Sequence, residues 1–202
     1  MRLTTDLKRD TVKGVFDKIL NEDTTLLSPR SLSIKEEYDK GKTEVDFSFY
    51  KEQKNKRDVL SFEKCQGKGF VDAIFTSCHL HFLEEYASLQ NISLVDIKMT
   101  PDFITSKKIS GTDASSRVTF RMQVKDHGIS EFCSESYSFV AASFRAVLSA
   151  FQFYINCDKT FKKLHLIRND ALSRNRSDIV QACLYDMSKI TEVNCYDTKG
   201  KI

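Results

Sequence analysis

The sequence predicts an α+β protein made of two similar β-β-β-α units, with one helix before them and one helix after them. The spacing of apolar residues changes from helical to alternating and back to helical, and then repeats this change. The two long helical segments also begin alike: FVDAIF at 70–75 and FVAASF at 139–144 share four of six residues. Self-similarity of this kind indicates a duplicated unit.

The N-terminal segment and the first unit follow from these two periodicities. Residues 5–21 are predicted to form an amphipathic helix, because their apolar residues recur at intervals of three and four. Turn-forming residues at 21–29 end this helix. Alternating apolar and polar residues then predict three strands, at 31–38, 44–51 and 58–65. A glycine-rich turn leads from the third strand into a predicted helix at 71–88.

The second unit repeats this order of elements. Its three strands are predicted at 92–99, 117–125 and 128–134, and its helix at 138–156. The strand residues Val45 and Phe47 recur 73 positions later, and the helix opening recurs 69 positions later. A three-stranded sheet with one helix buries its apolar face poorly on its own. We therefore expect the two units to pack together around a pseudo-twofold axis.

The chain is accordingly divided into three parts. These are an N-terminal helical part at 1–30, a two-unit domain at 31–156 with units 31–88 and 89–156, and a C-terminal part at 157–202. The C-terminal part carries a basic stretch at 159–176, for which a solvated surface is favoured over nucleic-acid binding. Ser177 and Asp178 are predicted to cap a final helix with an apolar stripe.

Composition excludes several classes of protein. The 202 residues include 31 lysines and arginines against 28 aspartates and glutamates, a balance that gives no argument for nucleic-acid binding. We expect no membrane span, because no apolar run approaches the length that one requires, and the first residues lack the apolar stretch of a signal peptide. The six cysteines are scattered, which favours free thiols and a cytoplasmic protein.

No motif in the chain indicates catalysis, a metal or a cofactor. His79 and His81 are two positions apart in a predicted helix, so their side chains face opposite sides and a structural role is favoured over metal binding. The separation of Cys133 from His127 by a turn and a strand gives no catalytic geometry. The glycine turn at 67–69 has neither of the spacings that cradle phosphates.

The glycine turn does predict a binding feature of another kind. Two glycines stand directly before a helix, whose first backbone N–H groups have no partner inside the helix and lie at its positive end. Such amides hold a carboxylate. That carboxylate is either the side chain of Asp72, acting as a cap, or a small ligand, and a tight turn without a ligand is the alternative.

Four segments together resemble the regulatory domain of the 2-isopropylmalate synthase and citramalate synthase family. They are GKGFVDAIF at 67–75, the strand at 92–99 with Asp96, ISGTDASSRVTFRMQV at 109–124, and SYSFVAASFRAVLSAFQFYIN at 136–156. The resemblance is close over 67–156. Phe70 stands where the family has a proline, and 131–137 lacks the family's second glycine turn. The catalytic TIM barrel of these transferases has no counterpart in this sequence.

The resemblance implies a non-catalytic allosteric domain that dimerises and binds leucine or isoleucine between its two units. It would give feedback control of branched-chain amino acid (leucine) biosynthesis through a partner synthase chain. The implied effector site comprises Gly69, Val71, Asp72, Ala73, Ile97, Ala114 and Phe139. Phe139 is larger than the family's aliphatic residue. The alternative is therefore a module that has lost its effector and serves dimerisation or protein–protein contact.

Overall fold

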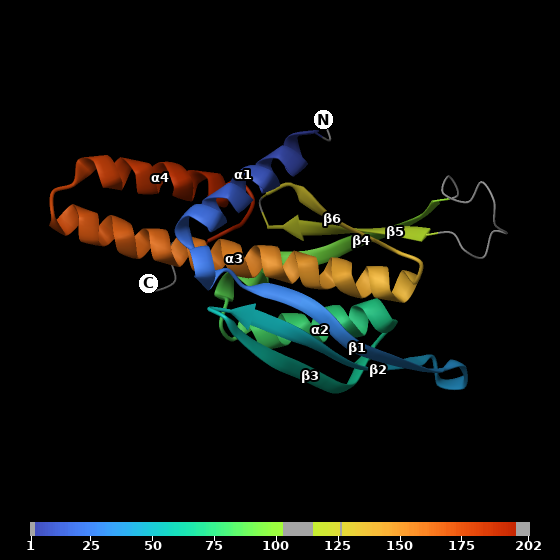
Figure 1. Cartoon of the computed structure of the whole chain (residues 1–202). Helices are drawn as coiled ribbons and strands as arrows, with labels where there is room; N and C mark the ends of the chain where they lie inside the picture. Colours follow the sequence, from blue (N-terminus) through green and yellow to red (C-terminus); the bar gives the residue numbers. More distant parts are fainter. Residues whose placement is uncertain (1–2, 103–114, 126, 197–202) are drawn as a thin grey trace.

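Two three-stranded antiparallel sheets form the frame of the protein (Figure 1). The computed structural model describes residues 3–102, 115–125 and 127–196. The first sheet contains β1 (Leu26–Glu37), β2 (Lys42–Gln53) and β3 (Lys56–Gly67), and the second contains β4 (Ile92–Asp102), β5 (Ser115–Val124) and β6 (Ile129–Ser136). In each sheet the spatial order of the strands follows the sequence. The α+β class predicted from the sequence is confirmed.

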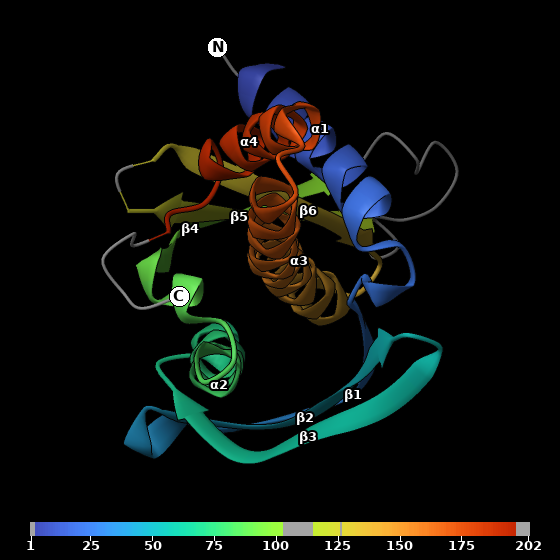
Figure 2. The ribbon, with the colours of Figure 1, turned by 90° about the vertical axis from the view of Figure 1, so that its left-hand side faces the viewer.

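Helices pack between the two sheets and against one another. They are α1 (Leu3–Ile19), α2 (Phe70–Leu83), α3 (Phe139–Ser173) and α4 (Ser177–Thr191), with short 3₁₀ segments η1 (Asn21–Asp23), η2 (Tyr38–Lys40) and η3 (Ala87–Asn91). In a view along α3, this helix lies between the two sheets, and α2 lies beside it over the first sheet (Figure 2). Helices α1 and α4 pack against α3 and against each other. The two sheets therefore pack against the same long helix, α3.

The pairing of the first two strands is alike in the two sheets, whereas a second register shift, between β2 and β3, has no counterpart between β5 and β6. Each first strand carries one extra residue where it pairs with the central strand. In β1 the extra residue is Arg30, next to Phe49 of β2, and in β4 it is Val95, next to Met122 of β5. Phe49 and Met122 are separated by the same 73 positions that relate the central strands in the sequence. Bulges at equivalent positions support a duplicated unit, because a bulge is a specific feature of strand geometry.

The core is built from the inward-facing residues of the central strands. On β2 these are Val45, Phe47 and Phe49, and on β5 they are Val118, Phe120, Met122 and Val124, all of them buried. Phe144 of α3 places its ring edge against Phe47, with 5.7 Å between the ring centroids. Tyr154, further along α3, contacts Phe132 of β6 at 5.7 Å. One helix thus supplies aromatic contacts to both sheets.

The helices differ from their predicted bounds for reasons of packing. Helix α2 ends at Leu83, not at residue 88, because the chain turns to bury Tyr86 and Leu89 in the core through η3. Helix α3 continues past residue 156 to Ser173, because Leu164 and Ala171 in its second half are buried beside α4. The basic residues of this half lie on a regular helix that crosses the expected boundary at 157.

The capping of α4 also differs from the expectation. Its N-cap residue is Arg176, and no side chain caps it among the described residues. The guanidinium of Arg176 instead donates two hydrogen bonds to Asp178, at 3.0 and 2.8 Å. This pairing lowers the pKa of the Asp178 carboxyl to about 2. The predicted final helix is present, but Ser177 and Asp178 do not cap it.

Strand β1 begins at Leu26, earlier than predicted, and α3 holds the chain just before it. Asn156 of α3 accepts a hydrogen bond from the backbone N–H of Thr25 and donates one to the Thr25 carbonyl, both at 2.9 Å. Gln152, one turn earlier on α3, accepts a hydrogen bond from the N–H of Leu27 at 2.9 Å. Two side chains of α3 therefore hydrogen-bond the backbone at the start of β1, an edge strand that has a strand partner on one side only.

No helix in the described part of the chain combines the length and the apolar character needed to cross a membrane.

The Asn156 contact gives a first prediction. Replacing Asn156 with alanine leaves the buried N–H and carbonyl of Thr25 without partners, and we expect a loss of about 3 kcal/mol in the free energy of unfolding. Asn169 lies on the exposed side of the same helix, so Asn169→Ala is the matched control and should change stability by less than about 0.5 kcal/mol. Urea unfolding followed by circular dichroism measures both. Equal losses of stability in the two variants would contradict a stabilising role for the hydrogen bonds between Asn156 and Thr25.

Candidate functional site

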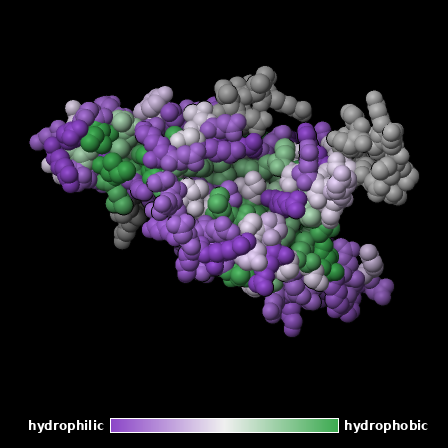
Figure 3. Space-filling view, viewed as in Figure 1, coloured by the Kyte–Doolittle hydropathy of each residue, from purple (hydrophilic) through white to green (hydrophobic). Residues whose placement is uncertain are grey.

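The starts of α2 and α3 lie against each other. The rings of Phe70 and Phe139, the first residues of the two helices, meet edge to face with 5.7 Å between centroids and 85° between planes. The two helix starts, which resemble each other in sequence, therefore also lie together in the structure. Figure 3 shows apolar side chains at the end of the molecule where α2 and α3 begin and another apolar patch at the opposite end, where α3 meets α4, on a surface that is otherwise mostly hydrophilic.

The turn before α2 depends on a close backbone contact. A Cβ atom on Gly67 would lie 2.5 Å from the backbone nitrogen of Ala73, so this position requires glycine. Gly69 is the N-cap residue and has extended backbone with φ of −172°, which any residue can adopt. Asp72 folds back over the turn and accepts a hydrogen bond from the Lys68 N–H at 2.9 Å.

The two helix starts differ in how their amides are satisfied. At α3, the Ser138 hydroxyl accepts a hydrogen bond from the Ala141 N–H at 3.2 Å, as an N-cap serine does. At α2 no side chain caps the helix within the described part of the chain. The Asp72 carboxylate accepts instead from the backbone N–H of Lys68, which precedes the helix. The first turn of α2 therefore lacks the side-chain cap that the first turn of α3 has.

The structure distributes the seven residues implied by the resemblance over several environments. Gly69, Asp72 and Phe139 lie at the paired helix starts. Val71 and Ala73 are buried in the core, with exposed fractions of 7% and 0%. Ile97 is on the edge strand β4, opposite Phe120, and is 41% exposed. Ala114 lies outside the described residues.

The contacts of His79 and His81 indicate a structural role for both side chains. His79 donates from Nε2 to the Leu89 carbonyl at 2.9 Å and stacks on Phe75, which fixes η3 to α2. His81 sets its ring edge against Phe62. No group of three or more potential metal ligands occurs among the described residues.

The six cysteines are free thiols. Burial raises the pKa of the Cys78 and Cys157 thiols well above the ordinary value, so these two thiols stay protonated and unreactive. Cys133 is exposed on β6, and its Sγ is 3.3 Å from the hydroxyl oxygen of Thr119. The described contacts give none of these thiols a catalytic partner.

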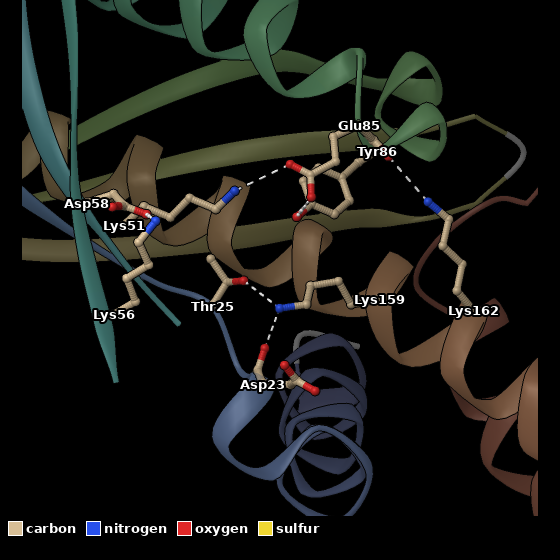
Figure 4. Close-up of polar contacts among 9 residues, drawn as sticks. All are labelled: Asp23, Thr25, Lys51, Lys56, Asp58, Glu85, Tyr86, Lys159 and Lys162. Atoms are coloured by element: carbon tan, nitrogen blue, oxygen red, sulfur yellow. Dashed lines mark hydrogen bonds and ion pairs between the residues drawn. The ribbon is translucent and has the colours of Figure 1, made fainter. Parts of the chain in front are cut away.

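A lysine cluster near the beginning of β1 was not predicted from the sequence (Figure 4). Lys159 of α3 is half-buried, donates a hydrogen bond to the Thr25 hydroxyl at 2.9 Å, and also donates to the Asp23 carbonyl. Burial lowers the pKa of Lys159 to about 8. The expectation of a solvated basic stretch is therefore wrong for this residue, because the helix turns Lys159 towards η1.

Neighbouring side chains extend this cluster across three elements. Lys51 of β2 forms an ion pair with Glu85 at 3.3 Å, and the Tyr86 hydroxyl donates to the same carboxylate at 2.7 Å. Lys162 of α3 donates to the Glu85 carbonyl at 3.3 Å. These contacts fasten β2, the turn after α2, and α3 to one another. Each lysine has an acidic or carbonyl partner, so the cluster has a structural role.

Comparisons with known proteins identify no family for this chain. No family model matches the chain, and a search of curated proteins gives no matching sequence.

The glycine turn generates the second prediction. Gly67→Ala places a methyl group against the backbone of Ala73, and overpacking of this kind lowers the free energy of unfolding by about 1–3 kcal/mol. Gly69→Ala is the matched control, because no heavy atom lies within 4 Å of its added Cβ, and its effect should stay within about 0.5 kcal/mol. Thermal and urea unfolding compare the two. A larger loss in Gly69→Ala would refute this account of the turn.

The half-buried Lys159 generates the third prediction. The pKa of Lys159 is about 8 in the folded protein, below the ordinary value of 10.5 that the unfolded chain approaches. Between these pH values the unfolded chain binds more protons, so this group makes the protein more stable as pH rises. Replacement of Lys159 by methionine should remove that rise, whereas Lys56→Met, at an exposed position on β3, should keep it. Urea unfolding across this pH range measures the difference, and parallel curves for all three proteins would contradict it.

Proposed function

We propose that this chain is a non-catalytic regulatory module of the 2-isopropylmalate synthase type, which binds leucine or isoleucine where α2 and α3 begin. One observation carries the proposal: two helix starts from a duplicated unit lie side by side, and the first amides of α2 have no side-chain cap in the described part of the chain. Two paired helix starts concentrate N–H donors and positive potential at one place.

The groups at this place match an amino acid in chemistry. The amides of Phe70 and Val71 would hold the ligand's carboxylate, since neither has a partner within the helix. The exposed carboxylate of Asp72, at the edge of the turn, would accept from the ammonium group. The half-buried rings of Phe70 and Phe139 would pack against the aliphatic side chain.

Occupancy of this site would be transmitted through α3. Because α3 packs on both sheets, a ligand that shifts its start relative to α2 changes how the two units are arranged. The proposed module regulates a partner synthase chain and acts as a homodimer, with no catalytic step of its own. A reducing cytoplasm suits its six free thiols.

A second function is favoured by a different feature of the same site. The rings of Phe70 and Phe139 are in contact and occupy space between the helix starts, and the adjacent Tyr137 is 79% exposed. In this alternative the module has lost its effector. Its apolar end then serves dimerisation or contact with another protein.

Calorimetry with leucine, isoleucine and valine is the test, and it forms our fourth prediction. We expect at least one of them to bind with a micromolar-to-millimolar dissociation constant. Asp72→Asn should weaken that binding by about tenfold, because the amide cannot form an ion pair with the ammonium group. Asp46→Asn is the matched control, since Asp46 also accepts a backbone hydrogen bond, from the N–H of Lys64 at 2.7 Å, but in the first sheet.

The outcomes separate the two functions. Absence of heat and of any thermal shift with all three amino acids would discard effector binding. Sedimentation of the unliganded protein then tests the alternative, which requires a stable dimer or a partner complex that Tyr137→Asp weakens.

A further inference from the structure

A pocket of about 390 Å³ lies between α1, the beginning of β1, β6 and α3, and it includes none of the residues assigned to the effector site. Its floor is aromatic. Phe153 of α3 contacts Phe16 of α1 at 5.6 Å and Phe132 of β6 at 5.7 Å between ring centroids. All three rings are buried, which gives the floor a fixed shape. A volume of this size suits a small organic molecule.

Cationic side chains from one face of α1 line the same pocket. Arg9 and Lys13 are four positions apart, so they lie one above the other on the helix. Arg9 is already oriented: its guanidinium donates to the Glu131 carbonyl and stands 5.4 Å from the centroid of the Phe132 ring. Lys13 has a side chain that is 54% exposed and forms only a surface ion pair with Asp10 in the described contacts. An exposed pair of this kind is weak and is readily exchanged for a ligand.

Helix α3 contributes polar groups to the lining of the pocket. Gln152 uses its Oε1 to accept from the Leu27 N–H, and among the described residues its Nε2 amide donates to no protein atom. That amide is thus a donor held in place by its own side-chain carbonyl. Asp17, one turn beyond Lys13, also lines the pocket and is the single acid among the lining residues. The lining therefore carries a net positive charge of one unit, which favours a monoanion over a dianion.

We propose that this pocket binds a small organic monocarboxylate with an apolar body, an aryl-alkyl carboxylate being the simplest example. The ring of the ligand lies on Phe16, Phe132 and Phe153. Its carboxylate lies at the rim, where Lys13 and Arg9 supply charge-assisted hydrogen bonds and Gln152 supplies a neutral one. This site is separate from the proposed amino-acid site and stands on different residues.

The test uses 3-phenylpropionate and two analogues of the same shape, 3-phenylpropanamide and 3-phenylpropylamine. Titration is followed by ¹H–¹⁵N NMR, and the side-chain amides of Gln152 and Asn156 report directly from the pocket. We expect millimolar or tighter binding of the carboxylate, with shifts at these amides, and at least about tenfold weaker binding of the amide and the amine. Shifts confined to other parts of the protein, no shifts at all, or equal binding of the three probes would overturn the proposal.

Charge reversal supplies a matched pair of variants. Lys13→Glu removes the exposed cation of the pocket and should weaken the carboxylate by more than about tenfold. Lys8→Glu makes the same charge change on the same helix, at a residue that pairs with Glu192 at 3.0 Å and does not line the pocket, and it should leave binding unchanged. Equal effects of the two variants would show a non-specific response to charge and would overturn the site. Binding of leucine or isoleucine at the helix starts should be the same in both variants, so failure of one site is distinguishable from failure of the other.

Discussion

The constraint on which this fold depends is that one helix must cover two sheets. The first sheet has α2 over it, but the second has α3, with α1 reaching only its edge strand β6. Burial of Val118, Phe120 and Met122 therefore depends on α3, and the same helix places Phe144 against Phe47 of the first sheet. If α3 moved away from either sheet, a row of large apolar side chains would be exposed to water, which makes the helix the least replaceable element of the core.

The two copies of the unit differ in their helices, since α3 packs on both sheets. Helix α2 covers only its own sheet and ends after 14 residues, whereas α3 runs for 35 residues and also supports α1 and α4. The turn before α2 needs the glycine at position 67 because the chain passes within contact distance of Ala73. The turn before α3 has no glycine and uses Ser138 as a cap instead. A duplicated unit can keep the bulge of its first strand while its two helix starts acquire different chemistry.

The parts that could be predicted from the sequence are those governed by local periodicity. The alternation of Val45, Phe47 and Phe49 requires a strand with one buried face, and the repeat of FVDAIF brings the two helix starts into equivalent places. Contacts between distant residues gave no such signal. Asn156 and Thr25 are 131 positions apart, and although Asn156 stands in an apolar stretch of the sequence, no local pattern indicates that Thr25 is its partner. Lys159 lies in a basic stretch that looks solvated, and only the geometry of η1 against α3 shows that it is half-buried.

The same distant contacts tie the two proposed sites to one element. Asn156 lines the pocket between α1 and α3 and also holds the backbone before β1, so a ligand in that pocket touches the junction that fixes the first sheet to α3. Phe139 begins the same helix at the paired helix starts. A continuous α-helix transmits a rigid displacement along its axis, because its backbone hydrogen bonds resist local deformation. Any coupling between the two sites would therefore have to be a movement of α3 relative to the sheets, and linkage requires each ligand to change the affinity of the other by the same factor.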